Sequence, residues 1–164
     1  MDMFKYIKKY WNKGLKYIVG IDEAGRGPLA GPVVAACVIV DNTFNVPGIN
    51  DSKKISAKKR EKLYPEIIKN AIDVSIGIAS EREIDSINIL QATFLAMKRA
   101  LGNLKFKPQQ ALIDGPYSNI KVIPVENIIK GDSLSLSIAA ASIIAKVKRD
   151  MIMRQYDLIF SEYA

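Results

Sequence analysis

The sequence predicts an α/β fold in which helices flank a mixed central β-sheet. Two short apolar, β-branched segments, at residues 17–22 and 33–40, come first and are typical of buried strands. Further along, amphipathic segments with helical spacing alternate with short apolar segments. This order favours one sheet of mixed direction with helices packed on it. The length of 164 residues suits a single domain with a sizeable core.

Each element follows from a local signal in the sequence. We expect strands at residues 17–22, 33–40, 73–79, 111–114 and 122–125, and helices at residues 56–71, 80–101 and 134–160. Ser56 is placed to cap the first helix, whereas Pro65 is expected to break or kink it. Ser80 and Glu83 have the spacing of a capping box, and Gly102 is a fitting end for the helix that they open.

The residue types that are absent or rare exclude several kinds of chemistry. The sequence has no histidine, which rules out Ser-His-Asp and Cys-His catalysis and His-ligated zinc. The single cysteine, Cys37, lies in an apolar segment, so we expect a packed core thiol without an internal disulfide. Neither a signal-peptide pattern nor an uninterrupted apolar window of about 18 residues occurs. We therefore expect a cytoplasmic protein without membrane contact.

Positive charge is concentrated in two segments. The formal net charge is +7. Residues 1–16 hold five lysines against one aspartate, and residues 52–70 hold seven basic residues against two glutamates. A basic balance of this kind favours a polyanionic partner such as nucleic acid. Solvated helix surfaces without such a partner are the alternative, and the charge pattern leaves both open.

A glycine-rich segment lies between the first two predicted strands. Gly25, Gly27 and Ala30 match the GxGxxA pattern of dinucleotide-binding loops. That pattern should open a helix, whereas a predicted strand follows here, so we reject the dinucleotide interpretation. The glycines instead indicate a loop whose backbone closely approaches a ligand, with Arg26 as its one cation.

Four carboxylates lie at the ends of predicted elements: Asp22, Glu23, Asp114 and Asp132. Each has a simpler interpretation, as part of a solvated acidic pair, as a turn-forming aspartate or as a helix N-cap. If the four converge, their repulsion requires raised pKa values or bound cations, and oxygen ligands favour Mg²⁺ or Mn²⁺. A two-metal site of this kind is suited to phosphodiester hydrolysis, which agrees with the basic charge.

Several separated motifs, taken in order, resemble those of bacterial ribonuclease HII. They are IDEAGRGP at residues 21–28, AGPV at 30–33, NDSKK at 50–54, DG at 114–115, KGD at 130–132 and SIAAASIIAKVKRD at 137–150. The resemblance implies a ribonuclease H-like catalytic domain at residues 17–164. Residues 1–16 are then a basic N-terminal extension outside the family core, whose lysines we expect to add non-specific duplex affinity.

The resemblance also implies an activity. Bacterial ribonuclease HII cuts the RNA strand of RNA/DNA hybrids and the 5′ side of ribonucleotides embedded in duplex DNA. The expected products are 3′-hydroxyl and 5′-phosphate ends, and the expected role is ribonucleotide removal during DNA replication and repair. Asp22, Glu23, Asp114 and Asp132 would be the catalytic ligands of a two-metal site for Mn²⁺ or Mg²⁺. We expect the protein to be a monomer.

The same motifs imply substrate-binding residues. Gly25, Arg26 and Gly27 would form a loop that contacts the ribose 2′-hydroxyl, the group that distinguishes RNA from DNA. Ser52 and Lys53 would contact phosphates of the duplex, which position the substrate without reading its base sequence.

The sequence departs from the family pattern at its C-terminal end. Family members continue past the position of residues 160–164 into a segment with a His-Lys-Gly-Tyr motif, whose tyrosine stacks at the RNA–DNA junction. This sequence ends before that motif, so substrate discrimination or activity is expected to differ. Two alternatives remain: an inactive truncated remnant that binds hybrids, and a related RNase H-like nuclease such as a junction resolvase or transposase domain.

Overall fold

The computed structural model describes residues 1–27, 30–49 and 54–161 of the chain. Five strands form one sheet in the spatial order β3-β2-β1-β4-β5. Their bounds are β1 Ile18–Ala24, β2 Val33–Ile39, β3 Asp73–Ala79, β4 Gln110–Asp114 and β5 Val125–Ile128. β1, β2 and β3 form an antiparallel meander, whereas β4 runs parallel to β1 and β5 parallel to β4. The expected α/β fold with a mixed sheet is confirmed.

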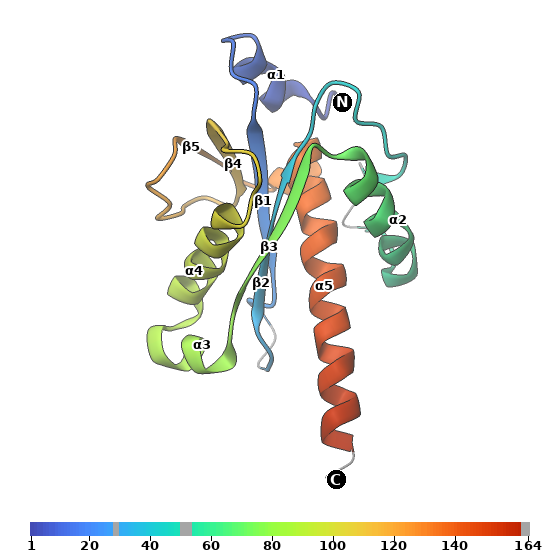
Figure 1. The fold of residues 1–164 in the computed structure, drawn as a ribbon, viewed down its shortest axis with the longest axis vertical. Helices are drawn as coiled ribbons and strands as arrows, with labels where there is room; N and C mark the ends of the chain where they lie inside the picture. Colours follow the sequence, from blue (N-terminus) through green and yellow to red (C-terminus); the bar gives the residue numbers. More distant parts are fainter. Residues whose placement is uncertain (28–29, 50–53, 162–164) are drawn as a thin grey trace.

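Helices cover both faces of the sheet (Figure 1). They are α1 Lys5–Trp11, α2 Ala57–Asn70, α3 Glu81–Ile87, α4 Ile89–Gly102, the short 3-10 turn η2 Gly131–Ser133 and α5 Leu136–Ser161. α3 and α4 lie on one face, and α5 and α2 lie on the other. α5 extends past the end of the sheet towards the C-terminus, and α1 lies at the opposite end of the molecule.

The core is divided into two clusters because successive strand residues point to opposite faces. On one face, Ile18 of β1 and Leu112 of β4 pack with apolar residues of α5 and α2. On the other face, Val19 and Ile113 pack with Phe94 and further residues of α4. Burial of the sheet on both faces explains why β2 is apolar throughout.

Close contact between helix and strand requires glycine at two positions. A Cβ atom on Gly20 would overlap the backbone of Ser137 in α5, and one on Gly77 would overlap the carbonyl oxygen of Ala96 in α4. The missing side chains let both helices lie directly on the sheet. The contact at Gly20 holds the start of α5 beside the strand end that carries Asp22.

The helix expected at residues 80–101 is two helices, α3 and α4. Asn88 separates them with a φ of 74°, a conformation that does not continue a helix. Its backbone N–H bonds the carbonyl oxygen of Ile84 at the end of α3, and its side chain accepts from the N–H of Gln91 at the start of α4. One asparagine therefore caps two helices, which the continuous apolar spacing does not reveal.

Two further expectations differ in detail from the structure. α2 is not broken at Pro65, because Leu63 and Ile67 on the same helix are buried and their packing outweighs one lost hydrogen bond. The last strand is β5 rather than residues 122–125. Val122 is 75% exposed, and Pro124 has no N–H to donate, although its carbonyl oxygen accepts from the N–H of Ala111 in β4. The residue-by-residue register with β4 therefore begins at Val125.

The N-terminal segment is docked on the domain. The backbone N–H of Leu136 at the start of α5 donates to the carbonyl oxygen of Met3 at 2.9 Å. Tyr10 of α1 is buried, and Lys9 and Tyr10 both donate to the carboxylate of Glu126 on β5. The N-terminal segment therefore contacts the start of α5 through Met3 and an edge strand of the sheet through α1.

Cys37 is buried in β2, as expected of a packed core thiol, and burial raises the pKa of its thiol. Among the helices in the described residues, none combines the length and the apolar character that crossing a membrane requires.

Candidate active site

The strand topology brings the predicted carboxylates to one end of the sheet. β1 and β4 are parallel neighbours, so their carboxyl ends meet at the same edge. The register pairs Ile21 with Ile113, which puts Asp22 beside Asp114 at the next position. Both aspartates share the face of the sheet that α5 covers, because side chains alternate along each strand.

Asp132 reaches the same place from the turn η2. Lys130 adopts a left-handed conformation, with a φ of 57° and a ψ of 36°, and leads the chain from β5 into this turn. The backbone N–H of Asp132 donates to Asp114 Oδ1 at 3.3 Å, and Asp132 is only 7% exposed. Since α5 begins at Leu136, the interpretation of Asp132 as the N-cap of the long helix is wrong.

Burial and mutual repulsion determine the acidity of this cluster. Asp22 is 5% exposed, so it is not part of a solvated acidic pair. Burial raises the pKa of Asp22 well above its usual range, and repulsion from Glu23, Asp114 and Asp132 raises it further. Burial also raises the pKa of Glu23, although the nearby Arg26 opposes this effect. Asp22 thus lies within electrostatic reach of the other three predicted carboxylates.

The donor set fits hard divalent cations. The four side chains offer only oxygen, the ligand type that Mg²⁺ and Mn²⁺ prefer. Glu23 Oε2 is buried and, within the described part of the chain, has no hydrogen-bond partner, so it is an acceptor that a cation would satisfy. As the described side chains lie, no three acidic or thiol groups are gathered closely enough to hold an ion. A cation would therefore have to draw the repelling oxygens together.

The glycine-rich loop continues directly from the acidic end of β1. Gly25 has a φ of 104°, which L side chains rarely adopt, so glycine is needed where the chain turns after Glu23. Arg26 Nη1 lies 3.9 Å from Glu23 Oε1, and the arginine side chain is 47% exposed. Among the described residues other than its chain neighbours, a Cβ atom on Gly27 would meet nothing within 4 Å. The described part of the chain thus leaves space at Gly27 into which a ligand could come close.

Two of the predicted substrate-binding residues lie outside the described part of the chain, and one residue that contacts the loop was not predicted. Ser52 and Lys53 lie outside the described residues, so their phosphate contacts stay a prediction. Arg149 of α5, to which the sequence pattern assigns no role, donates to the carbonyl oxygens of Ala30 and Pro32. Its place in the last of the family-like motifs is the signal that could have identified it.

Comparison with known proteins decides the family. The profile described as Ribonuclease HII matches residues 19–162. The chain belongs to the ribonuclease HII family. The ribonuclease HII of Syntrophotalea carbinolica is 56% identical over 151 residues, which cover 92% of this chain and 72% of that protein. The chain spans between 60% and 80% of the length of the curated relatives that it matches.

Solved structures agree with this assignment. The ribonuclease HII of Archaeoglobus fulgidus, solved in complex with PCNA, has a TM-score of 0.76 at 30% identity and covers 88% of this chain and 78% of its own. Bst-RNase HIII, solved in complex with Mn²⁺, has a TM-score of 0.77 at 22% identity over 88% of this chain and 55% of its own. The fold is thus ribonuclease H-like, and ribonuclease HII proteins are metal-dependent endoribonucleases. The alternative of a junction resolvase or transposase domain is set aside.

Proposed function

We propose that this chain is an endonuclease that cuts the RNA strand of RNA/DNA hybrids and the 5′ side of ribonucleotides embedded in duplex DNA. The observation that carries the proposal is that the buried Asp22 lies within electrostatic reach of Glu23, Asp114 and Asp132, where β1, β4 and η2 meet. Membership of the ribonuclease HII family supports the substrate class. The biological role that follows is the removal of ribonucleotides during DNA replication and repair.

Asp22, Glu23, Asp114 and Asp132 would hold Mn²⁺ or Mg²⁺, and manganese is the ion in the solved Bst-RNase HIII structure. When bound, a pair of such ions supplies Lewis-acid chemistry for the attack of water on phosphorus and for the departure of the leaving oxygen. The water oxygen forms a new bond to phosphorus while the bond from phosphorus to the 3′ oxygen of the nucleotide that precedes the ribonucleotide breaks. The water gives up a proton, and the departing 3′ oxygen takes one up. The products are a 3′-hydroxyl and a 5′-phosphate. The burial of Asp22 keeps its oxygens away from competing solvent.

The glycine-rich loop would select the ribose. Backbone groups of Gly25, Arg26 and Gly27 would contact the 2′-hydroxyl, which only the ribonucleotide carries. Two observations support this assignment: Gly25 comes two residues after Glu23, and the described residues leave the space beside Gly27 open. Ser52 and Lys53 would contact phosphates and so set the position of the duplex.

The test is cleavage of a DNA duplex that contains one ribonucleotide, in Mn²⁺, in Mg²⁺ and in EDTA. We expect a metal-dependent cut on the 5′ side of the ribonucleotide, and we expect Asp22→Asn to abolish it. Asp85→Asn, which changes an exposed aspartate of α3, is the matched control and should leave cleavage unchanged.

Two outcomes would contradict the proposal. Cleavage of an all-DNA duplex at a similar rate would show that the ribose is not read. Binding of the duplex without a cut in either metal would show that the chain is an inactive hybrid-binding remnant.

A further inference from the structure

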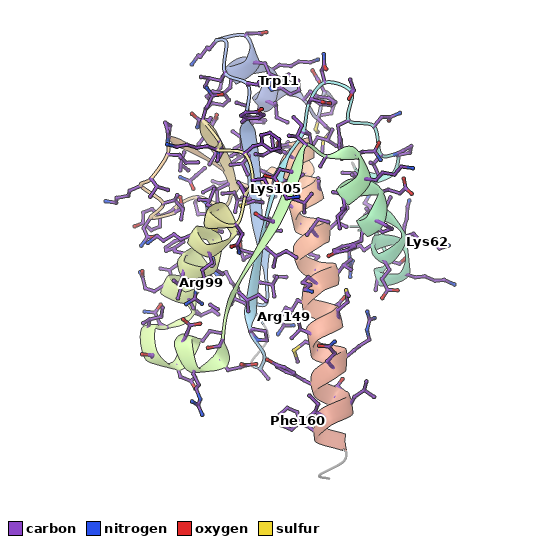
Figure 2. All side chains as sticks on the ribbon, in the orientation of Figure 1. Trp11, Lys62, Arg99, Lys105, Arg149 and Phe160 are labelled. Atoms are coloured by element: carbon purple, nitrogen blue, oxygen red, sulfur yellow. The ribbon has the colours of Figure 1, made fainter. Side chains whose placement is uncertain are left out.

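The far limb of the glycine-rich loop, residues 30–32, is held by the side chain of Arg149 from α5. Arg149 Nη2 donates to the carbonyl oxygen of Ala30 at 2.6 Å, and Arg149 Nε donates to that of Pro32 at 3.0 Å. Figure 2 shows Arg149 where α5 passes the lower end of the sheet. The arginine thus binds the loop just before it enters β2.

The near limb of the loop, residues 25–27, packs against the same guanidinium at Gly25. A Cβ atom on Gly25 would lie 2.5 Å from Arg149 Nε and 2.6 Å from the carbonyl oxygen of Pro32. On the far limb, a Cβ atom on Gly31 would lie 2.8 Å from Arg149 Nη2 and 2.5 Å from Met153 Sδ. Both glycines have positive φ values, 104° and 94°. The two limbs are therefore folded so closely around Arg149 that neither position has room for a side chain.

The position of the near limb matters for the site. Gly25 comes two residues after Glu23, and Arg26, the next residue, lies 3.9 Å from the Glu23 carboxylate. A shift of the backbone at Gly25 would therefore move both charged groups. Only arginine has a planar fork of donors that can serve two carbonyl oxygens at once and still present a flat face to a glycine.

We propose that Arg149 is a positioning residue for the reaction. It joins the two limbs of the loop and so sets where the loop backbone and Glu23 stand relative to the ribonucleotide. This inference rests on the proposed function, and it gives Arg149 no contact with substrate or ion. The selection of the ribose then depends on a residue of α5, which lies far along the sequence from the loop itself.

The first test compares Arg149→Gln with Arg154→Gln. Arg154 lies on the same helix, but its ion pair, at 2.7 Å, is with Glu61 of α2, so it controls for the loss of one arginine from α5. We expect Arg149→Gln to lower kcat/KM for a duplex with one ribonucleotide about 10- to 100-fold. Losses of this size occur when catalytic groups are misplaced relative to the substrate. The loss on a continuous RNA/DNA hybrid should be smaller, because every position there offers a 2′-hydroxyl. Arg154→Gln should cleave both substrates as the wild type does.

A second test needs no activity. Trypsin cleaves after Arg26, and the fragments 1–26 and 27–164 can be followed by mass spectrometry. We expect Arg149→Gln to speed this cleavage about tenfold, as a released loop would, whereas Arg154→Gln leaves it unchanged. Arg149→Lys should fall between the two, because an ammonium group cannot serve both carbonyl oxygens in the same geometry.

The outcomes separate the two proposals. If the wild type cuts neither substrate, the proposed function fails, and the trypsin rates still decide the role of Arg149. If the wild type cuts and Arg149→Gln changes neither the substrate preference nor the trypsin rate, the positioning role is wrong. An equal loss on both substrates that matches a lowered unfolding temperature would also overturn it, because a purely structural residue gives that result.

Discussion

At the scale of single residues, the carboxylates of the site repel one another electrostatically. Asp22 is buried in the neighbourhood of three further acidic side chains, and one oxygen of Glu23 is buried without a partner in the described structure. Buried charges of like sign cost folding free energy unless a cation or a proton offsets them. A divalent cation held by these carboxylates, as we propose, would therefore stabilise the folded protein.

This proposal predicts a metal-dependent stability. Without divalent ions, Asp22→Asn should be more stable than the wild type, because the change removes one buried carboxylate. Mn²⁺ at a hundredfold excess over its dissociation constant should stabilise the wild type by about 2.7 kcal/mol. For a domain of this size that corresponds to roughly 5–11 °C in the unfolding temperature.

Thermal unfolding with and without Mn²⁺ measures this effect. The shift caused by Mn²⁺ should be small in Asp22→Asn and unchanged in the control Asp85→Asn. An equal shift in Asp22→Asn and the wild type would show that the ion binds elsewhere.

At the scale of the elements, one charged network ties α3, α4 and β3 together. Ser80 and Glu83 form the capping box that opens α3, as the sequence predicts. Arg99 of α4, labelled in Figure 2, donates to both oxygens of Glu83 at 2.7 and 2.6 Å and to the carbonyl oxygen of Ile78 at 2.7 Å. The bonds from Arg99, followed by the backbone bond from Ser80, lower the pKa of Glu83 to about 2.

The lowered pKa of Glu83 predicts a pH-dependent contribution to stability. The contribution is complete above the usual pKa of 4.5 and is lost as the pH falls towards 2, because the folded state holds the charged form more strongly than the unfolded state does. Glu83→Gln keeps a side chain suited to the capping box and removes the charge. It should lower the unfolding temperature at pH 7 only modestly, since exposed ion pairs contribute little.

Unfolding temperatures between pH 7 and pH 2.5 test this. The difference between Glu83→Gln and the wild type should stay constant down to about pH 5 and then shrink. The exposed Glu66 of α2 offers a control, Glu66→Gln, for the general effect of acid. A difference that persists undiminished at pH 2.5 would contradict the charged role of Glu83.

At the scale of the whole molecule, the basic N-terminal helix lies against the β5 edge of the sheet. α1 is tied to Glu126 on β5, and β5 pairs with β4, which carries Asp114. Lys8 and Lys9 form ion pairs with Asp2 and Glu126, whereas no ion pair within the described residues involves the other lysines of this segment, Lys5, Lys13 and Lys16. These three carry the charge that is most available to a polyanion.

The triple variant Lys5→Gln, Lys13→Gln, Lys16→Gln should weaken non-specific duplex binding. The slope of log K against log salt should become shallower by about 0.9 for each phosphate that the variant no longer neutralises. A triple variant of equal charge at Lys98, Lys105 and Lys107, all exposed beyond the N-terminal segment, should keep the slope. Substitution is a cleaner experiment than deletion of residues 1–16, because Tyr10 is buried in the core. An unchanged slope in the first variant would show that these lysines do not contribute to non-specific duplex binding.

Elements with local signals were predictable from the sequence. The strand at residues 73–79, the cap at Ser56 and the capping box at Ser80 agree with the structure, because period, capping and turn chemistry act over a few residues. The break at Asn88 and the start of β5 were not predictable from local pattern. They depend on how segments pack and on which strand supplies the hydrogen bonds.

The sequence by itself determined the fold class, the family resemblance and the four acidic residues, because their types and motifs are read along the chain. Only the tertiary structure decided that these residues meet. The parallel register of β1 and β4 and the close contact of α5 at Gly20 bring Asp22, Asp114 and Asp132 together across long stretches of sequence. The hold of Arg149 on the glycine-rich loop arises in the same way, since its donors and their acceptors lie more than a hundred residues apart.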